Sequence, residues 1–494
     1  MNPGRNLLAG LANSVWSALL GFAVVPFYLS YLGMEAYGLI GFYMTMQAML
    51  QLLDMGLAPA INREVARSSA GGDLRSVAGL LHTLAVVYWC VAGLIALLVT
   101  LLSSWIAEHW LQSSQLSSQT VAGAVMLMGL VAACRWPLGL YQGALIGAQR
   151  VTVASSINMA MTTVSTLGAL FVLAYAAPSI EAFFIWQAGV GLAHAFAMRL
   201  AAWRAVGRSG GLRFHPREIW AIWRFSAGMS GIAVTALVFT QLDKLVLSRT
   251  VGLEAFGHYM LATLVVSGLQ VLIVPVFNVI YPRMTALVEA GEVTQLVDMY
   301  RTGTRMFALI VFPAAMLIAV FANDFVAVWT RSPEVATHVA PIVTLLVMGS
   351  ALNAVMYFPY ALQLAYGKTW IPLALNVALT CLMVPLVLSL AHNYGAVGGA
   401  VAWLIIEAVY VVVGPWLTHK FLLKRMATRW LIQDVGVPLG LTIVMGGGAH
   451  WFVQNAELPF FLEVLAVLLF VVPVIGAIVR MSPRLRHMAG SLFA

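Results

Sequence analysis

The chain contains very little charge. Only 9% of its 494 residues are Asp, Glu, Lys or Arg, and 62% are hydrophobic, whereas a soluble domain carries about 25% charged residues. This composition excludes an ordinary soluble enzyme and indicates a protein embedded in lipid.

Signatures of several enzyme classes are also missing. The three cysteines, Cys90, Cys134 and Cys381, lie inside hydrophobic runs and form neither a secreted disulfide framework nor a metal-binding cluster. The sequence has no G-x-x-x-x-G-K-[ST] phosphate loop and no H-E-x-x-H pattern. No loop is long enough for a catalytic or nucleotide-binding domain. We therefore expect a protein that is not an enzyme and that has no cofactor and no metal.

Long hydrophobic runs fill most of the chain. A spanning helix needs about 20 mostly apolar residues, and fourteen such runs can be marked out. Backbone groups in lipid must be satisfied internally, and these runs are too long for barrel strands, so the pattern predicts an all-α polytopic membrane protein. The first run is too long for a cleaved signal peptide, and we expect it to stay as a span. The predicted spans are 6–31, 36–60, 76–103, 118–146, 151–176, 181–203, 225–247, 255–281, 304–329, 336–366, 370–391, 396–418, 430–453 and 459–480.

The basic residues alternate with these spans. With a cytoplasmic N-terminus, 22 of the 26 Lys and Arg residues fall on inner segments. Cytoplasmic segments of membrane proteins carry such an excess, so both termini are predicted to be cytoplasmic. The net charge of +8 is then a topology signal, with attraction to anionic membrane lipids second, and it does not indicate a nucleic-acid partner. The exceptions are Arg135, Lys244, Arg249 and Arg331.

A short phrase occurs twice. Residues 32–38 read LGMEAYG and residues 251–257 read VGLEAFG, so that Gly33 and Gly252 stand 219 positions apart. Six predicted spans separate the copies, and an even number predicts a parallel repeat. The predicted organisation is a six-helix lobe over 1–205, a cytoplasmic linker with an amphipathic helix over 206–224, a second six-helix lobe over 225–422, and two additional helices within 423–494.

Arg135 is the clearest candidate for a functional side chain, because an ionisable residue in the middle of a span is costly. Arginine stays charged and can bind phosphate oxygens through two parallel hydrogen bonds. Gln142 lies seven residues on, on the same helix face, and Pro137 can open the backbone locally. We interpret Arg135 and Gln142 as substrate-binding residues that face a hydrated cavity. The alternative is an arginine paired with an acid on a neighbouring helix.

Asp54 lies in the second predicted span, and Arg63 falls at the inner end of that span. Asp54 has two open interpretations: a structural partner for a buried cation such as Arg135, or a proton or sodium site for ion coupling. Arg63 is either a substrate contact at the cavity mouth or an inner cation placed by topology alone.

The second half offers a matching set. Arg283 and Arg305 mirror the inner cations of the first half and are candidate substrate contacts. Asn353, Tyr357 and Tyr360 share a face of the tenth span, which suggests either a sugar-binding face or ordinary aromatic packing.

The second half also holds acids within spans. Glu407 is a candidate for ion coupling; Glu407, Asp434 and Glu463 are acids for which the sequence suggests no partner. Asp243 and Lys244 are neighbours, and because adjacent residues do not share a helix face, we expect them to have different partners.

Three segments resemble the polysaccharide transporter branch of the multidrug/oligosaccharidyl-lipid/polysaccharide (MOP) exporter superfamily, in particular the Wzx-type O-antigen and exopolysaccharide flippases. They are PFYLSYLGMEAYGL at 26–39, LLDMGLAPAINREVAR at 52–67 and QLDKLVLSRTVGLEAFGHYMLA at 241–262. These motifs mark the family and leave the substrate open.

The resemblance implies two six-helix lobes around a central cationic cavity in the bacterial inner membrane. It implies that a polyprenyl-diphosphate-linked oligosaccharide moves from the inner to the outer leaflet by alternating access. A coupling ion, H⁺ or Na⁺, or consumption of the product outside would drive the movement. A polysaccharide polymerase and a chain-length regulator are implied partners. The first span has no arginine between Asn6 and Leu32, unlike the related lipid II flippases, and this weighs against that substrate.

Other functions remain open at this point. A multidrug or cation antiporter of the same superfamily would favour the buried acids over Arg135. A membrane scaffold for glycan-assembly enzymes would carry out no transport of its own. A membrane-embedded glycosyltransferase would need larger loops than this chain has.

Overall fold

The computed structural model describes residues 3–54, 56–71, 77–207, 214, 216–424 and 426–456. These residues are almost entirely helical, and their one β-type pairing is an isolated bridge between Gln112 and Gly252. They divide into two compact units, Met1–Gly257 and His258–Ala494. The predicted all-α fold class is thereby confirmed, while the predicted span 459–480 and Glu463 lie outside the described residues.

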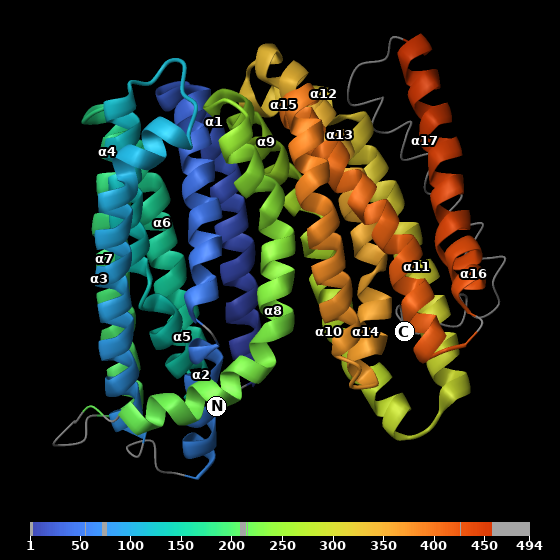
Figure 1. Cartoon of the computed structure of the whole chain (residues 1–494), viewed down its shortest axis with the longest axis horizontal. Helices are drawn as coiled ribbons and strands as arrows, with labels where there is room; N and C mark the ends of the chain where they lie inside the picture. Colours follow the sequence, from blue (N-terminus) through green and yellow to red (C-terminus); the bar gives the residue numbers. More distant parts are fainter. Residues whose placement is uncertain are drawn as a thin grey trace. The chain divides into compact units, whose positions relative to one another are not determined.

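Helices of the first unit run side by side (Figure 1). Apolar residues fill nearly every turn of these long helices, as lipid-facing and buried faces both require. The elements are α1 (Pro3–Leu50), η1 (Gln51–Asp54), α2 (Leu57–Ala70), α3 (Ala78–His109), α4 (Ser118–Arg135), α5 (Leu138–Gly147), α6 (Val151–Tyr175), α7 (Ile180–Val206) and α8 (Pro216–Thr250).

The second unit has the same kind of architecture. α9 (Leu253–Ser267) begins in the first unit and continues into the second. It is followed by α10 (Gln270–Glu289), α11 (Val293–Val320), α12 (Ala322–Thr330), α13 (Pro333–Val355), α14 (Tyr357–Ala365), α15 (Trp370–Phe421), α16 (Ala427–Arg429), the π-helical η3 (Trp430–Gly436) and α17 (Val437–Ala456).

Eleven helical stretches among the described residues are long and apolar enough to cross a membrane. Two of these stretches each overlap two predicted spans. Within each, the backbone leaves helical geometry between the two spans, at Gly33 in α1 and at Gly395 in α15, where φ is +79° and +59°. Glycine tolerates such positive φ values without strain. The count of fourteen spans stays a prediction.

The sequence repeat is visible in where helices begin and end. α2 ends at Ala70 and α10 ends at Glu289, a difference of 219 residues. The same difference separates Leu138, which opens α5, from Tyr357, which opens α14. Both halves therefore break a long span at the same repeat position, and in the first half that break follows Arg135 directly.

The two copies of the repeated phrase pack against each other within residues 34–257. A Cβ on Gly38 would lie 2.2 Å from the Leu253 carbonyl oxygen, and one on the equivalent Gly257 would lie 2.6 Å from the Met34 carbonyl oxygen. Small residues at such crossings let helix backbones approach closely. This reciprocal contact explains why the phrase contains glycine at its last position in both copies.

α8 begins with a segment that crosses one end of the first unit and then bends to run beside α1 (Figure 1). α8 also contacts α2 and α3 and thus groups with the first unit, although the repeat assigns it to the second half. The predicted domain boundaries and the interfacial helix within 206–224 stay predictions.

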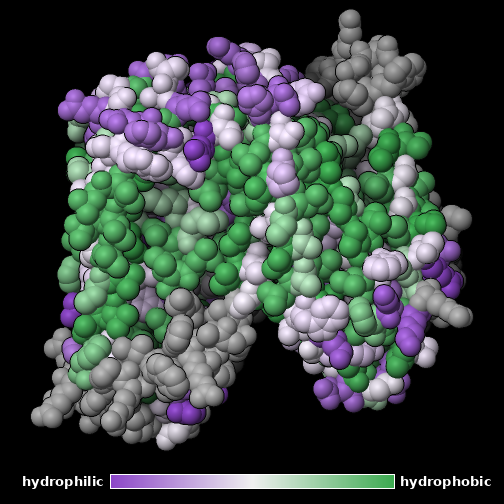
Figure 2. Space-filling view, viewed as in Figure 1, coloured by the Kyte–Doolittle hydropathy of each residue, from purple (hydrophilic) through white to green (hydrophobic). Residues whose placement is uncertain are grey.

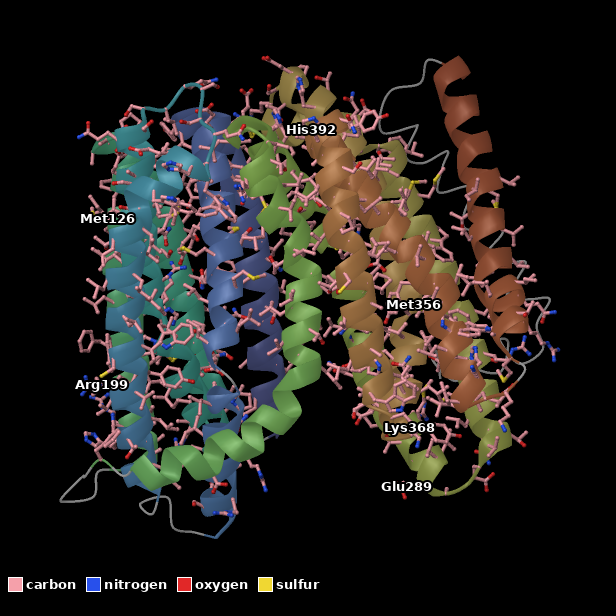
Figure 3. The ribbon with its side chains drawn as sticks, in the orientation of Figure 1. Met126, Arg199, Glu289, Met356, Lys368 and His392 are labelled. Carbon is pink, nitrogen blue, oxygen red and sulfur yellow. The ribbon has the colours of Figure 1, made fainter. Side chains whose placement is uncertain are left out.

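Polarity follows the helix axes. Apolar side chains form a broad band, and hydrophilic ones gather at helix ends (Figure 2). In the second unit, Lys368 and Glu289 lie at one end and His392 at the other (Figure 3). This distribution is the one expected of helices that cross a bilayer.

Candidate functional site

Arg135 is the last residue of α4 and stands at an interruption of the fourth predicted span. Pro137 follows at the junction, and α5 restarts at Leu138. Proline lacks a backbone N–H and cannot continue a helix ladder, so the expected local opening is confirmed. The interruption lets α4 and α5 present Arg135 and Gln142 to one space.

Neutral groups hold the Arg135 guanidinium. Its Nη2 donates to Gln187 Oε1 on α7 at 2.5 Å and to Ser165 Oγ on α6 at 3.3 Å. Ser165 Oγ in turn donates to Gln187 Oε1 at 2.6 Å. No carboxylate lies within 4.0 Å of Arg135 among the described residues. The side chain is therefore fixed in direction while its positive charge stays uncompensated at close range.

Arg135 lines a cavity of about 440 Å³ within the first unit. Three glutamine side chains face the same space, so it combines one cation with several groups that both donate and accept hydrogen bonds. Its walls come from α1, η1, α2, α3, α4 and α5. The lining residues are Gln47, Leu50, Gln51, Asp54, Ala58, Tyr88, Ala132, Arg135, Trp136, Leu138, Gly139 and Gln142.

Asp54 shares this cavity with Arg135. The Tyr88 hydroxyl donates to Asp54 Oδ1, and the backbone N–H of Ala58 donates to Oδ2 at 3.3 Å. Asp54 is thus held by η1, α2 and α3 and makes no ion pair with Arg135 at or below 4.0 Å. The structure thus brings three of the candidate site residues, Asp54, Arg135 and Gln142, into the lining of one cavity.

Arg63 takes a different position. It lies on α2 with an exposed side chain, and it is not among the residues that line the cavity. Its neighbour Arg67 pairs with Glu64 at 2.7 Å on the same helix. Substrate contact by Arg63 stays a prediction.

Sequence reasoning did not connect to Arg135 or Asp54 the residues that hold their side chains in place. Gln187, Ser165 and Tyr88 are polar groups in otherwise apolar helices, and only their polarity signalled them. Their partners are 30 to 52 residues away along the chain. His194, also on α7, bonds Asn158 at 2.9 Å.

In the second unit, two predicted residues pair with each other. The Asn353 side-chain amide donates to both carboxylate oxygens of Glu407 at 3.0 Å, joining α13 to α15. Glu407 is fully buried. Glu407 therefore has a partner, which the sequence did not suggest.

Tyr357 and Tyr360 of α14 lie in an aromatic cluster with α10. Their rings stand 5.6 Å from that of Phe277, edge-on for Tyr357 and stacked for Tyr360. Phe277 also stacks on Tyr281 at 5.7 Å. All four rings are partly exposed, and no hydroxyl of the three tyrosines has a hydrogen-bond partner among the described residues. Such rings offer apolar faces with polar tips.

Arg305 proves to be an ion-pair partner. Its Nη2 lies 2.7 Å from Asp434 Oδ1, and Arg301 Nε lies 2.8 Å from Asp434 Oδ2. Asp434 sits fully buried in η3, so this acid has two arginine partners that the sequence did not suggest. These pairs fasten η3 and α17 to α11, and a substrate contact by Arg305 stays a prediction.

A correction concerns Asp243 and Lys244. Lys244 Nζ lies 3.2 Å from Asp243 Oδ1 and also donates to the Thr240 carbonyl at 2.8 Å. The expectation of different partners was wrong, because a long lysine stem can fold back along its own helix and reach the adjacent carboxylate.

The structure places Arg283 in a separate cavity between α10 and α11. Its side chain is exposed, and no carboxylate approaches it within 4.0 Å among the described residues.

Comparison with known proteins places the chain in context. Residues 4–288, more than half of the chain, match a family described as "Polysaccharide biosynthesis protein". The chain is 21% identical to "Putative O-antigen transporter" of Shigella flexneri over 82% of this chain and 97% of that protein. It is 23% identical to "Lipopolysaccharide biosynthesis protein WzxC" of Escherichia coli K12 over 45% of each chain.

Solved structures are similar across most of the chain. The structure of the lipid II flippase MurJ in an inward closed conformation gives a TM-score of 0.66 at 11% identity, covering 96% of this chain and 99% of that one. An inward-facing MATE family multidrug transporter of the MOP superfamily gives 0.63 at 16% identity, covering 84% and 94%. These similarities show that the fold is the one expected from the MOP superfamily resemblance.

Proposed function

The chain belongs to the polysaccharide biosynthesis protein family, and from this premise we propose that it is a flippase for a polyprenyl-diphosphate-linked oligosaccharide. We propose that it carries an O-antigen or exopolysaccharide repeat unit from the inner to the outer leaflet by alternating access. The protein is multi-pass. Its location in the bacterial inner membrane with both termini cytoplasmic is part of the proposal and is supported by the distribution of Lys and Arg.

The observation that carries this function is the uncompensated charge of Arg135 in the cavity of the first unit. A sugar diphosphate cannot cross about 30 Å of hydrocarbon unaided, because its charges and hydroxyls lose their hydration. A fixed guanidinium offsets part of that loss through charge-assisted hydrogen bonds to phosphate oxygens. Gln142, which lines the same cavity, can donate to the remaining oxygens.

Sugar rings need a different surface. We propose that Tyr357 and Tyr360, with the neighbouring Phe277, contact the oligosaccharide through ring faces and tyrosine hydroxyls. Asn353 contributes less directly, since its amide is committed to Glu407. Arg63, Arg283 and Arg305 complete the proposed set of substrate contacts near the inner side.

Ion coupling is proposed for Asp54 and Glu407. Asp54 lies in the cavity with Arg135, so a proton or Na⁺ bound there changes the net charge that an anionic headgroup meets. Glu407 is buried, and its hydrogen-bond partner among the described residues is the neutral amide of Asn353. A polysaccharide polymerase and a chain-length regulator are proposed as partners downstream of transport, from the family resemblance alone.

The experiment is deletion of the gene in its source bacterium, followed by extraction of polyprenyl-linked glycans and staining of surface polysaccharide. We expect lipid-linked oligosaccharide to accumulate on the inner leaflet and surface polymer to be lost. A plasmid with the wild-type gene should remove the accumulated lipid and restore the surface polymer. The Arg135→Ala protein should insert normally into the membrane and yet do neither. Normal surface glycans in the deletion strain would refute the proposed function.

A second candidate is a multidrug or cation antiporter of the same fold, which the carboxylate of Asp54 in the cavity favours. This function predicts altered drug or ion sensitivity with intact surface glycans. In that case Asp54→Asn, and not Arg135→Ala, would abolish activity.

A further inference from the structure

A cavity of about 880 Å³ lies between α10 and α11 in the second unit. The two helices form an antiparallel hairpin, because α10 ends at Glu289 and α11 begins at Val293. The turn between them lies at one end of the unit, beside Glu289 (Figure 3). This cavity is distinct from the one that Arg135 lines.

Polar and apolar groups are separated along this cavity. On α11, Asp298 and Thr302 lie within the first three helical turns, close to the α10–α11 hairpin. Met306 and Ile310 lie about one and two helical turns beyond Thr302, farther from the hairpin. On α10, Arg283 is six residues from the helix end and Val279 lies one turn deeper. The polar groups therefore gather near the hairpin end, and the remainder of the cavity is apolar.

The apolar part has a defined floor. Gly303 of α11 permits the Phe358 ring to cross it, since a Cβ there would lie 2.7 Å from that ring. Phe307 lies 5.8 Å from Phe358, centre to centre, and both are almost fully buried. The cavity is thus a groove with a packed base, and it opens at apolar side chains such as the half-exposed Ile310.

The positive charge of Arg283 indicates that the head group of the ligand is anionic. Arg283 is exposed at the polar end, and no carboxylate lies within 4.0 Å of it among the described residues. A cation at the polar end of a groove with an apolar interior matches an amphiphile with an anionic group and a long apolar chain. The acidic Asp298 lines the same cavity and opposes this attraction.

We propose that the groove between α10 and α11 binds the hydrocarbon chain of an anionic polyprenyl lipid, with its phosphate group at Arg283. A single groove fits one chain, whereas a phospholipid brings two. The inference rests on the proposed function, because that function supplies a polyprenyl lipid as cargo. It adds a second place where the cargo lipid can bind, with its tail in the groove and its phosphate at Arg283, separate from the cavity that Arg135 lines.

The test is photolabelling of the full-length protein, purified in detergent, with a photoreactive polyprenyl phosphate. Labelled peptides should map to residues 270–310. Unlabelled polyprenyl phosphate should compete, and phosphatidylglycerol at the same concentration should compete at least fivefold less well. Equal competition by the two lipids would identify an ordinary lipid-facing crevice and would overturn the proposal.

Variants separate the tail from the head. Met306→Trp fills the groove and should abolish labelling, while Val271→Trp, on an exposed α10 position outside the cavity, should leave it unchanged. Arg283→Gln should weaken competition about fivefold, the value of one cation near an anionic lipid group. Asp298→Asn should strengthen it. If neither Met306→Trp nor Arg283→Gln changes the labelling or the competition, the proposal that this groove binds the lipid is refuted.

Photolabelling and the deletion strain together test the lipid site and the proposed flippase function separately. If the deletion strain accumulates lipid-linked oligosaccharide but the groove is not labelled, the flippase function stands and the tail site falls. If the groove is labelled as expected but deletion leaves surface glycans intact, the protein binds the lipid without transporting it, and the proposed function falls.

Discussion

Replacing Gln187 by glutamate changes the charge beside Arg135 while preserving side-chain length. Gln187 Oε1 already lies 2.5 Å from the Arg135 guanidinium, so a carboxylate at that position forms an ion pair without rearrangement. A phosphate bound on the other side of the guanidinium would lie about 6 Å from the new charge. At an effective dielectric constant of about 20, the repulsion is about 3 kcal/mol, which weakens anion binding about 100-fold.

Two assays measure this loss. Trp136 lines the same cavity, so its fluorescence can report binding of inorganic pyrophosphate to the purified full-length protein. Complementation of the deletion strain reports export of surface polysaccharide. We expect Gln187→Glu to lose both signals, with normal amounts of protein in the membrane.

The control is Gln187→Met, which matches the length of glutamine and removes its hydrogen bonds without adding a charge. It should weaken pyrophosphate binding about tenfold, the effect of losing one hydrogen bond to a charged group, about 1.5 kcal/mol. Wild-type binding and export in Gln187→Glu would refute the claim that an uncompensated Arg135 charge recognises the substrate. Equal losses in both variants would show that positioning matters and charge does not.

Three further predictions test other parts of the structure. Asp434→Asn leaves Arg305 and its partner arginine without their carboxylate, and should lower stability by about 3 kcal/mol, measured by thermal unfolding in detergent; an unchanged midpoint would remove the anchoring role of this ion pair. Gly38→Ala places a methyl group 2.2 Å from a backbone carbonyl oxygen and should lower the free energy of unfolding by about 1–3 kcal/mol through overpacking. The control is Gly10→Ala, where a Cβ meets nothing within 4 Å, and it should not lower the midpoint in the same assay. Asp54→Asn removes the carboxylate from the cavity of Arg135 and should strengthen pyrophosphate binding about tenfold, because a repelling charge is lost. Equal binding by wild type and variant would contradict a role for Asp54.

Composition and periodicity were enough to predict the fold class. Helices in lipid must be long, apolar and internally hydrogen-bonded, so hydropathy alone locates them, and thirteen of the predicted spans overlap helices in the structure. Pro137 likewise marked the break after Arg135, because the lack of a backbone N–H acts locally. The repeated phrase indicated a doubled architecture, which the equal helix boundaries now match.

Partnerships between side chains could not be predicted in this way. Asp434 meets Arg301 and Arg305 from about 130 residues away, and Asn353 meets Glu407 across 54 residues. Hydropathy treats each of these residues as a polar interruption and carries no information about which helices become neighbours. The pairing depends on how helices pack in space, which is set by many side chains at once.

The same division applies to the candidate site. From the sequence, Arg135 could be placed within an apolar span, where a charge is costly and a functional role is the default expectation. The partners of Arg135 became known only from the fold: its guanidinium donates hydrogen bonds to Gln187 and Ser165, and Asp54 shares its cavity without forming an ion pair with it. The physical reason is that a single residue type fixes a charge, whereas the field around that charge depends on which groups three-dimensional packing brings within a few ångströms.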